Sequence, residues 1–171
     1  MAKKVSLRQF QEGLVARLKE VQSGTVTQSA SKMGVQVGAE KWLVNLPDVS
    51  EVVPLPNLLA VPLTQPWFSG VANVRGVLYS VIDFSRFLGG EPTQVNIDSR
   101  LVLANTKFHL NAGIIVHHML GLKNPDQLQS RATENLPPWI VAEHTDSNGE
   151  IWKELYMPGL INHPDFLNVG V

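Results

Sequence analysis

The chain has 171 residues, of which 44% are apolar and 17% charged, and its formal net charge is −1. This composition predicts one compact domain, or two closely packed subdomains, with a sizeable core. A charge so near zero provides no basic field for nucleic acid or anionic lipid, and the absence of cysteine excludes disulfides and thiolate metal sites. We expect a cytoplasmic protein without direct membrane insertion, because no apolar run approaches membrane-spanning length and no signal peptide is recognisable.

The first segment predicts an amphipathic helix followed by a linker. Residues 6–9 have the pattern of a capping box. Apolar side chains then recur at helical spacing, namely Leu7, Phe10, Leu14, Leu18 and Val21. The spacing predicts a helix from Ser6 to roughly Gln22 that stops near Gly24. A polar linker follows, so we expect residues 1–31 to form a helix-and-linker unit and residues 32–171 to form the main domain.

From Val35 onward, short apolar segments alternate with glycine, proline, asparagine and aspartate, which is typical of barrels of short strands. The predicted strand segments are 35–37, 42–44, 52–55, 58–63, 101–104, 113–116, 140–143 and 150–156. The last two flank a strong hairpin turn at 146–149. Short helical pieces are predicted within 126–130 and 158–167, and residues 91–99 are predicted to cross between two halves.

The stretch from Gln65 to Gly90 combines the most informative local signals. A glycine turn is predicted at Gly70, and the β-branched and aromatic run from Val77 to Ile82 predicts a strand. Asp83 then suits the N-cap of a short helix, because its carboxylate can accept from the free N–H groups at the helix start. Gly89 suits the left-handed position after the last helical residue.

Between Gly70 and this strand lies a polar segment, Asn73 to Gly76. An amide and a guanidinium inside an apolar, glycine-flanked hairpin are either hydrogen-bonded within the protein or presented to a partner. The residues by themselves leave both interpretations open for Asn73 and Arg75.

No catalytic, cofactor-binding or metal-binding arrangement is recognisable. His117 and His118 are adjacent in a predicted strand, so their side chains point to opposite faces and cannot bind one ion together. Spaced histidine motifs and a nucleophile elbow are both absent. Asp83 fits a helix cap better than a general base. We therefore predict no enzyme, and exposed apolar surface is the remaining route to function.

The run Gly70–Val77, followed by Val81–Phe84, resembles the signature of the CheW-like adaptor domains of bacterial chemosensory systems. The similarity extends upstream to Val35–Trp42 and Val49–Val53, and downstream as far as Leu122. What the resemblance implies is a mainly β fold of two packed, five-stranded SH3-like barrels. The barrels would be divided near 91–99, with strands able to exchange between them. The N-terminal helix and short C-terminal helical pieces would be additions.

The resemblance also implies a function without a cofactor. Members of this family are adaptors that join the cytoplasmic tip of a methyl-accepting chemoreceptor to the regulatory domain of a CheA-type histidine kinase. They are cytoplasmic and are recruited to membrane receptor arrays through these partners. The receptor tip is a helical hairpin, and its expected acceptor is an apolar groove between the barrels.

The positions that match the family motif are the expected partner-binding residues, namely Val49, Glu51, Val71, Asn73, Arg75 and Gly76. We expect Glu51 and Arg75 to pair at the edge of the groove, and the N-terminal helix to pack away from it.

Two features resemble the PilI-like subgroup of type IV pilus systems, which controls twitching motility. One is the N-terminal helix, and the other is the tail from Trp152 to Leu167. The chain also has Ser80 where the family commonly has proline. A flagellar chemotaxis adaptor of the same mechanism remains an alternative, as does a small ligand-binding β-barrel protein from a different class.

Overall fold

A computed structural model of the protein describes residues 11–12 and 31–171. The predicted N-terminal helix and linker lie outside the described residues, apart from Gln11, Glu12 and Ser31. Within the described parts, no helix is both long and apolar enough to cross a membrane.

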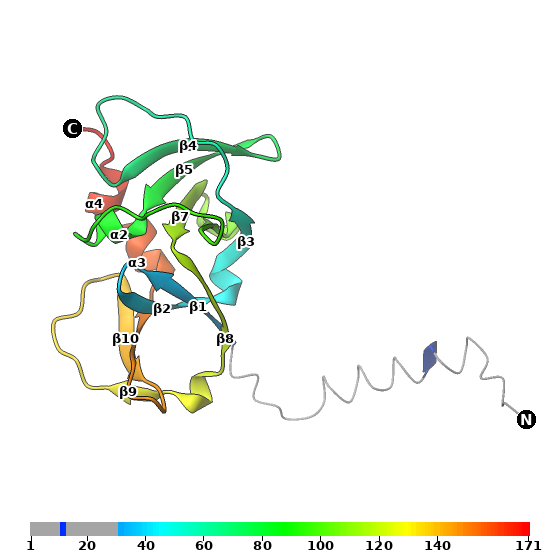
Figure 1. Ribbon diagram of the computed structural model, residues 1–171, viewed down its shortest axis with the longest axis vertical. Coiled ribbons are helices and arrows are strands. Elements are labelled where there is room, and N and C mark those ends of the chain that lie inside the picture. Colours follow the sequence, from blue (N-terminus) through cyan, green and yellow to red (C-terminus); the bar gives the residue numbers. More distant parts are fainter. Residues whose placement is uncertain (1–10, 13–30) are drawn as a thin grey trace, which may run out of the picture.

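The protein is built from two β-sheets and a few short helices (Figure 1). One sheet contains β1 (Lys32–Val37), β2 (Glu40–Asn45), β8 (His118–Lys123), β9 (Gln129–Arg131), β10 (Ile140–Thr145) and β11 (Ile151–Leu155). The other contains β3 (Val49–Pro54), β4 (Phe68–Val74), β5 (Val77–Asp83), β6 (Arg100–Ala104) and β7 (Ala112–Val116). Among residues 31–171 the helices are α2 (Phe84–Phe87), α3 (Met157–Ile161) and α4 (Pro164–Leu167), and 3-10 turns cover Leu46–Asp48, Thr106–Phe108 and Pro125–Gln127.

The strand order shows how the chain is shared between the sheets. The six-stranded sheet has the order β8-β1-β2-β11-β10-β9, and the five-stranded sheet has the order β3-β6-β7-β5-β4. The chain therefore changes sheet between β2 and β3, and returns between β7 and β8. The segment 91–99 lies between α2 and β6, and the strands before and after it, β5 and β6, belong to the same five-stranded sheet. The division of the domain near 91–99 stays a prediction. The expected mainly β fold of two packed sheets is confirmed, with β9 as a sixth strand in one of them.

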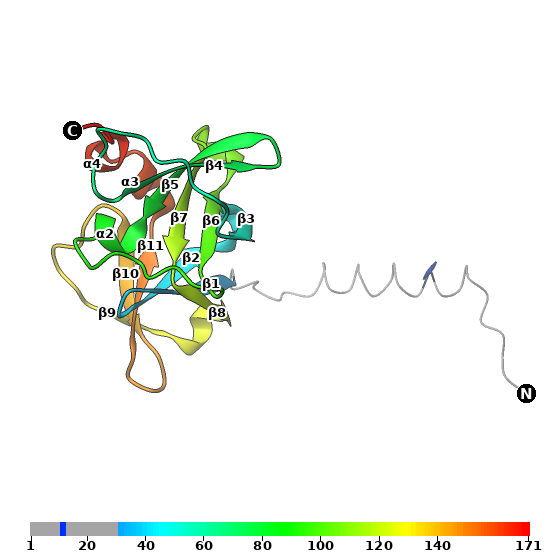
Figure 2. The same cartoon turned by 45° about the horizontal axis from the view of Figure 1, so that its top comes forward.

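The main core lies where the two sheets and the C-terminal helices meet. Trp42 of β2, Ile114 of β7 and Leu160 of α3 are all buried in this one cluster. The ring of Trp42 meets that of Phe84 edge to face, with centroids 5.0 Å apart. Figures 1 and 2 both place α2 near the C-terminal helices, where Phe87 of α2 contacts Phe166 of α4 with ring centroids 5.6 Å apart. The C-terminal tail is thus part of the core.

A second, smaller core lies within the five-stranded sheet. Its buried members are Ala72, Val81, Leu101, Leu103 and Ile115. Val53 of β3 and Val74 of β4 pack against this cluster, although these strands are at opposite ends of the strand order. The sheet therefore curves around its own core until its two edges approach each other, as in a small barrel.

Gly70 does not form the turn that the sequence predicted. It lies inside β4 at an irregularity of the β4–β5 pairing, with φ of +131°. A Cβ atom there would lie 2.4 Å from the carbonyl oxygen of Leu59. Two backbone hydrogen bonds join Leu59 to Val71. The strand predicted at 58–63 does not form, because Leu59 is the only one of its residues that pairs with a strand in the described structure. The glycine is needed for the close approach of two backbones rather than for a turn.

Two further local predictions need correction. The helical piece expected within 126–130 is a 3-10 turn at Pro125–Gln127, and the short strand β9 follows it. His117 is not in a strand but lies between β7 and β8, where its backbone N–H donates to the carbonyl of Gln36. The predicted C-terminal helical pieces are confirmed as α3 and α4.

The hairpin turn predicted at 146–149 is confirmed, and Asp146 organises it. One carboxylate oxygen accepts from the backbone N–H groups of Asn148 and Glu150, at 2.9 and 3.0 Å. The other accepts from the indole N–H of Trp152 at 3.0 Å. These hydrogen bonds, that from Trp152 above all, lower the pKa of Asp146 below its ordinary value. Gly149 provides the positive φ, +79°, that the turn requires.

Asp83 is the helix cap that the sequence predicted, and it also holds the loop after α2. Its Oδ1 accepts from the backbone N–H of Arg86 at 3.4 Å and from the hydroxyl of Thr93 at 2.7 Å. Its Oδ2 accepts from the backbone N–H of Thr93 at 2.8 Å. Because Asp83 is buried, both oxygens are needed as acceptors.

We predict that Asp83→Asn destabilises the protein, although a cap alone would tolerate it. Whichever way the amide is turned, its NH2 group would face the backbone N–H of Thr93 or that of Arg86, which should lower the free energy of unfolding by about 1–3 kcal/mol. Asp83→Ala should lower it by about 2–4 kcal/mol, since the cap is lost as well. Urea unfolding measures both values. An Asp83→Asn variant with a nearly unchanged free energy of unfolding would contradict the double role of Asp83 as the cap of α2 and the acceptor for Thr93.

Glu154 of β11 is a buried carboxylate shared by two partners. Oε1 accepts from the Lys32 ammonium at 2.6 Å, and Oε2 lies 2.7 Å from Nε2 of His144. Burial by itself raises the pKa of Glu154, but the hydrogen bonds from Lys32 and His144 outweigh this effect and lower it below 4.5. A carboxylate with a lowered pKa stabilises the folded state above its ordinary pKa and loses this effect as the pH falls.

We therefore predict that Glu154→Gln flattens the acid side of the stability profile. The free energy of unfolding of the native protein should fall between about pH 5 and pH 3, and the fall should be shallower in the variant. The variant should also be less stable at neutral pH, because Lys32 loses its buried partner. Glu143→Gln is the control, since Glu143 accepts an exposed hydrogen bond from Thr133. If the free energy of unfolding fell equally steeply with decreasing pH in both variants, Glu154 would not be the source of the acid sensitivity.

Candidate partner-binding site

The polar segment at the end of β4 forms the tip of the β4–β5 hairpin. Val74 pairs with Val77, so Arg75 and Gly76 are the two turn residues, with φ of +50° and +84°. Two positive φ values characterise the type I′ turn, whose twist matches that of the flanking strands. The side-chain oxygen of Asn73 accepts from the N–H of Gly76 at 2.8 Å. Asn73 and Gly76 thus fix the turn that presents Arg75.

Arg75 forms a forked ion pair with Glu51 of β3. The two guanidinium nitrogens Nη1 and Nη2 donate to Oε2 and Oε1 at 2.6 and 2.5 Å. The pairing expected from the family motif is therefore confirmed. The side chain of Arg75 is 75% exposed and that of Glu51 is 31% exposed. The pair connects the two edge strands of the five-stranded sheet on the outside of the barrel, where a partner can reach it.

Val49 and Val71 lie on the same two strands but have different surroundings. Val49 begins β3, is half-buried and packs against the main core. Val71 is half-buried in β4, and its backbone pairs with Leu59 at 2.8 and 2.9 Å. The structure thus brings Glu51 together with Arg75 and Asn73 together with Gly76, and it gives both valines local packing or pairing roles.

Two exposed leucines belong beside these residues and were missed by the sequence analysis. Leu59 pairs with Val71, and Leu78 pairs with Asn73. Directly paired residues share a face of a sheet, so both leucines lie on the outward face of the hairpin. Their exposed fractions are 69% and 62%. The register of the hairpin around Arg75-Gly76 would have indicated Leu78, whereas Leu59 depends on a long-range bridge.

This exposed polar tip with apolar flanks is a surface that another protein can reach. The pattern of the CheW-like domain matches residues 32–165. The chain belongs to the CheW-like domain family, whose members are non-enzymatic scaffold proteins.

The chain is also similar to three individual proteins. It is 31% identical to Protein PilI of Pseudomonas aeruginosa over 172 residues, which cover 96% of this chain and 90% of that protein. It is 24% identical to Chemotaxis protein CheV3 of Helicobacter pylori over 74 residues, covering 43% of this chain and 24% of that protein. The crystal structure of the scaffolding protein TtCheW from Thermoanaerobacter tengcongensis matches with a TM-score of 0.63 and 18% identity. That match covers 74% of this chain and 88% of TtCheW, and it supports the fold.

We predict that the Glu51–Arg75 pair contributes little to stability. An exposed ion pair is worth about 0–1 kcal/mol, because solvent screens it and two long side chains must be ordered. Arg75→Ala and Glu51→Ala should each change the free energy of unfolding by no more than about this amount. Thermal or urea unfolding measures the change. Gross unfolding of Arg75→Ala would show that the pair is needed to close the barrel.

Proposed function

We propose that the chain is a signalling adaptor that couples the cytoplasmic tip of a chemoreceptor to the regulatory domain of a CheA-type histidine kinase. Its system controls twitching motility by type IV pili. Membership of the CheW-like family and the similarity to PilI along almost the whole chain support this proposal. In this proposal the protein is cytoplasmic and reaches membrane receptor arrays through its partners.

The exposed ion pair at the hairpin tip is the observation that carries the proposal. An arginine side chain has five N–H donors, and two hydrogen bonds join Arg75 to Glu51. The remaining donors can bind a partner while Glu51 keeps the guanidinium in a fixed orientation. Because the pair adds little to stability, its geometry is suited to recognition rather than to holding the fold.

The surroundings of the pair suit a helical partner. Leu59 and Leu78 offer exposed apolar surface beside the polar tip, and interfaces combine an apolar centre with polar contacts at its rim. A helical receptor hairpin would place apolar side chains against these leucines and polar groups against Arg75. The proposed partner-binding residues are Val49, Glu51, Val71, Asn73, Arg75 and Gly76, and the two leucines extend this set.

Binding of Arg75→Ala tests the proposal directly. The immobilised variant should bind a receptor-tip fragment, or the kinase regulatory domain, at least about tenfold more weakly than the native chain. Arg131→Ala is the matched control, because Arg131 lies in the exposed strand β9 of the other sheet. Unchanged affinity of Arg75→Ala for both partners, in a folded variant, would refute this site.

The pilus assignment needs a separate measurement. A strain that lacks the chain should lose twitching motility and keep swimming motility. Restoration of twitching by the native chain, but not by Arg75→Ala, would connect the site to this output. Loss of swimming with intact twitching would instead support the flagellar alternative.

A further inference from the structure

The connection between β3 and β4 carries exposed apolar residues of which the partner-binding site described above includes only the first. Residues 59–63 read Leu-Ala-Val-Pro-Leu, and all five are exposed. Leu63, at the end of this apolar run, is 80% exposed. Folded proteins avoid exposed runs of more than about three apolar residues unless the run has a function. The apolar run 59–63 is therefore a candidate for a contact with another molecule.

Backbone hydrogen bonds hold the apolar run in place at both ends. Leu59 exchanges two of them with Val71 of β4, at 2.8 and 2.9 Å. The carbonyl of Leu63 accepts from the backbone N–H of Val171 at 3.1 Å. Figures 1 and 2 both show the β3–β4 connection passing over β4 towards the C-terminal end of the chain. The run is therefore positioned before a partner arrives, which lowers the ordering cost of binding.

Leu63 has a backbone conformation that leucine rarely adopts. Its φ of +59° lies in the left-handed region, where asparagine and aspartate are enriched among the residues other than glycine. Such conformations persist only where the surrounding structure imposes them, and they are frequent at binding sites. The protein thus exposes an apolar side chain at a position whose backbone would suit asparagine better.

The apolar run continues the surface around the hairpin tip. Leu59 pairs with Val71, and two positions further along β4, Asn73 pairs with Leu78, which is 62% exposed. Arg75 follows at the tip. Residues 55–66 contain no charged side chain. The combined surface is therefore apolar along the connection and charged at the end where Arg75 lies.

The backbone of β4 indicates what kind of partner can bind here. A partner strand would need free N–H and C=O groups at the edge of the sheet, but those of Val71 in the middle of β4 already bond to Leu59. The partner must therefore bind through side chains, as an amphipathic helix does. The 7 residues of β4 span about 20 Å, which is the length of a helix of about 14 residues, or four turns.

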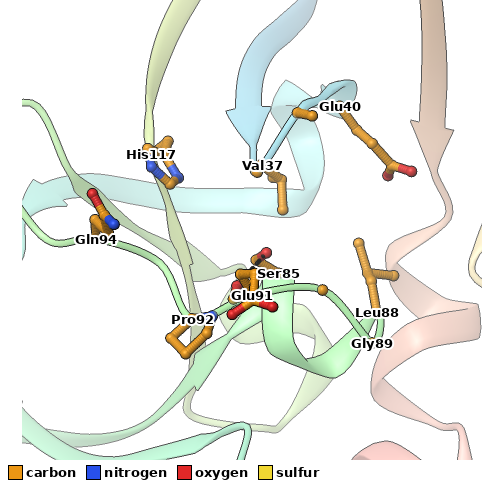
Figure 3. A pocket seen from close by; sticks show the side chains of 12 residues that line it. Val37, Glu40, Ser85, Leu88, Gly89, Glu91, Pro92, Gln94 and His117 are labelled. Atoms are coloured by element: carbon orange, nitrogen blue, oxygen red, sulfur yellow. Dashed lines mark hydrogen bonds between the residues drawn. The ribbon is translucent and has the colours of Figure 1, made fainter.

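The pocket beside α2 does not suit such a partner. It has a volume of about 640 Å³ and lies between the β1–β2 turn, α2 with the loop after it, and the β7–β8 connection (Figure 3). A Cβ atom on Gly38 would lie 3.2 Å from the hydroxyl of Ser85, so two walls of the pocket nearly touch at this point. A helix with its side chains is about 10–12 Å wide and needs a more open surface.

We propose that one amphipathic helix of the receptor tip docks along β4, with its apolar face on the apolar run and Leu78 and with an acceptor group at Arg75. The helix then lies on the outer edge of the five-stranded sheet rather than in a groove between the barrels. This inference rests on the proposed adaptor function, and it adds Val61 and Leu63 to the binding surface.

Leu63→Asn tests the docking surface in the full chain. The substitution removes the apolar side chain but suits the positive φ, so the variant should fold, which thermal unfolding will verify. Its dissociation constant for a receptor-tip fragment should rise about tenfold. The matched control is Leu122→Asn, because Leu122 is 67% exposed in β8 of the other sheet. The control should bind the fragment as the native chain does.

Comparison with Arg75→Ala separates this inference from the proposed function. If Arg75→Ala weakens binding and Leu63→Asn does not, the helix does not lie on the apolar run, and the adaptor site at the hairpin tip stands without it. Unchanged affinity of both variants would overturn the proposed site together with this inference. Equal weakening by Leu63→Asn and Leu122→Asn would also overturn it.

A photo-cross-link identifies the molecule that covers the apolar run. Benzoylphenylalanine in place of Val61, which is 38% exposed, is introduced into the full chain and irradiated with the receptor-tip fragment. Mass spectrometry should locate the cross-link on the apolar face of one helix of the fragment. A cross-link to a second copy of the chain, or to residues 1–30 of the same chain, in place of the fragment would overturn the proposal.

Discussion

The structure depends on one shared core between two sheets that exchange the chain between them. Val35 of the six-stranded sheet and Ile82 and Val102 of the five-stranded sheet are almost fully buried in the same cluster. Neither sheet can cover this apolar face alone, because a sheet must bury it against another layer. The C-terminal helices close the remaining side of the core through residues such as Leu160 and Phe166. Residues at both ends of the described chain are thus needed for one hydrophobic core.

The five-stranded sheet is packed on both faces, against the shared core on one and against a smaller core on the other. This sheet has a small core of its own and curves until β3 and β4 approach each other. The tip of the β4–β5 hairpin then lies over β3, where Arg75 reaches Glu51. An exposed pair at this position contributes little to stability.

Asp83 links the fold to the pocket beside α2. It ends β5, caps α2 and holds Thr93, and this loop is one wall of the pocket near His117. The pocket and the hairpin tip both belong to segments around β5, yet they use different residues. The strand β5 therefore positions both the hairpin tip around Arg75 and the loop after α2.

Local sequence signals determined most of the strands, the hairpin turn at Asp146, the cap at Asp83 and the polar turn around Arg75, because each depends on neighbours within a few residues. The family resemblance added the pairing of Arg75 with Glu51. Only the tertiary structure decided that Thr93 uses both oxygens of Asp83, that Gly70 faces the backbone of Leu59, and that His117 and Glu91 line one pocket. These contacts join segments separated by ten or more residues, and packing of the whole chain, rather than local propensity, brings such segments together.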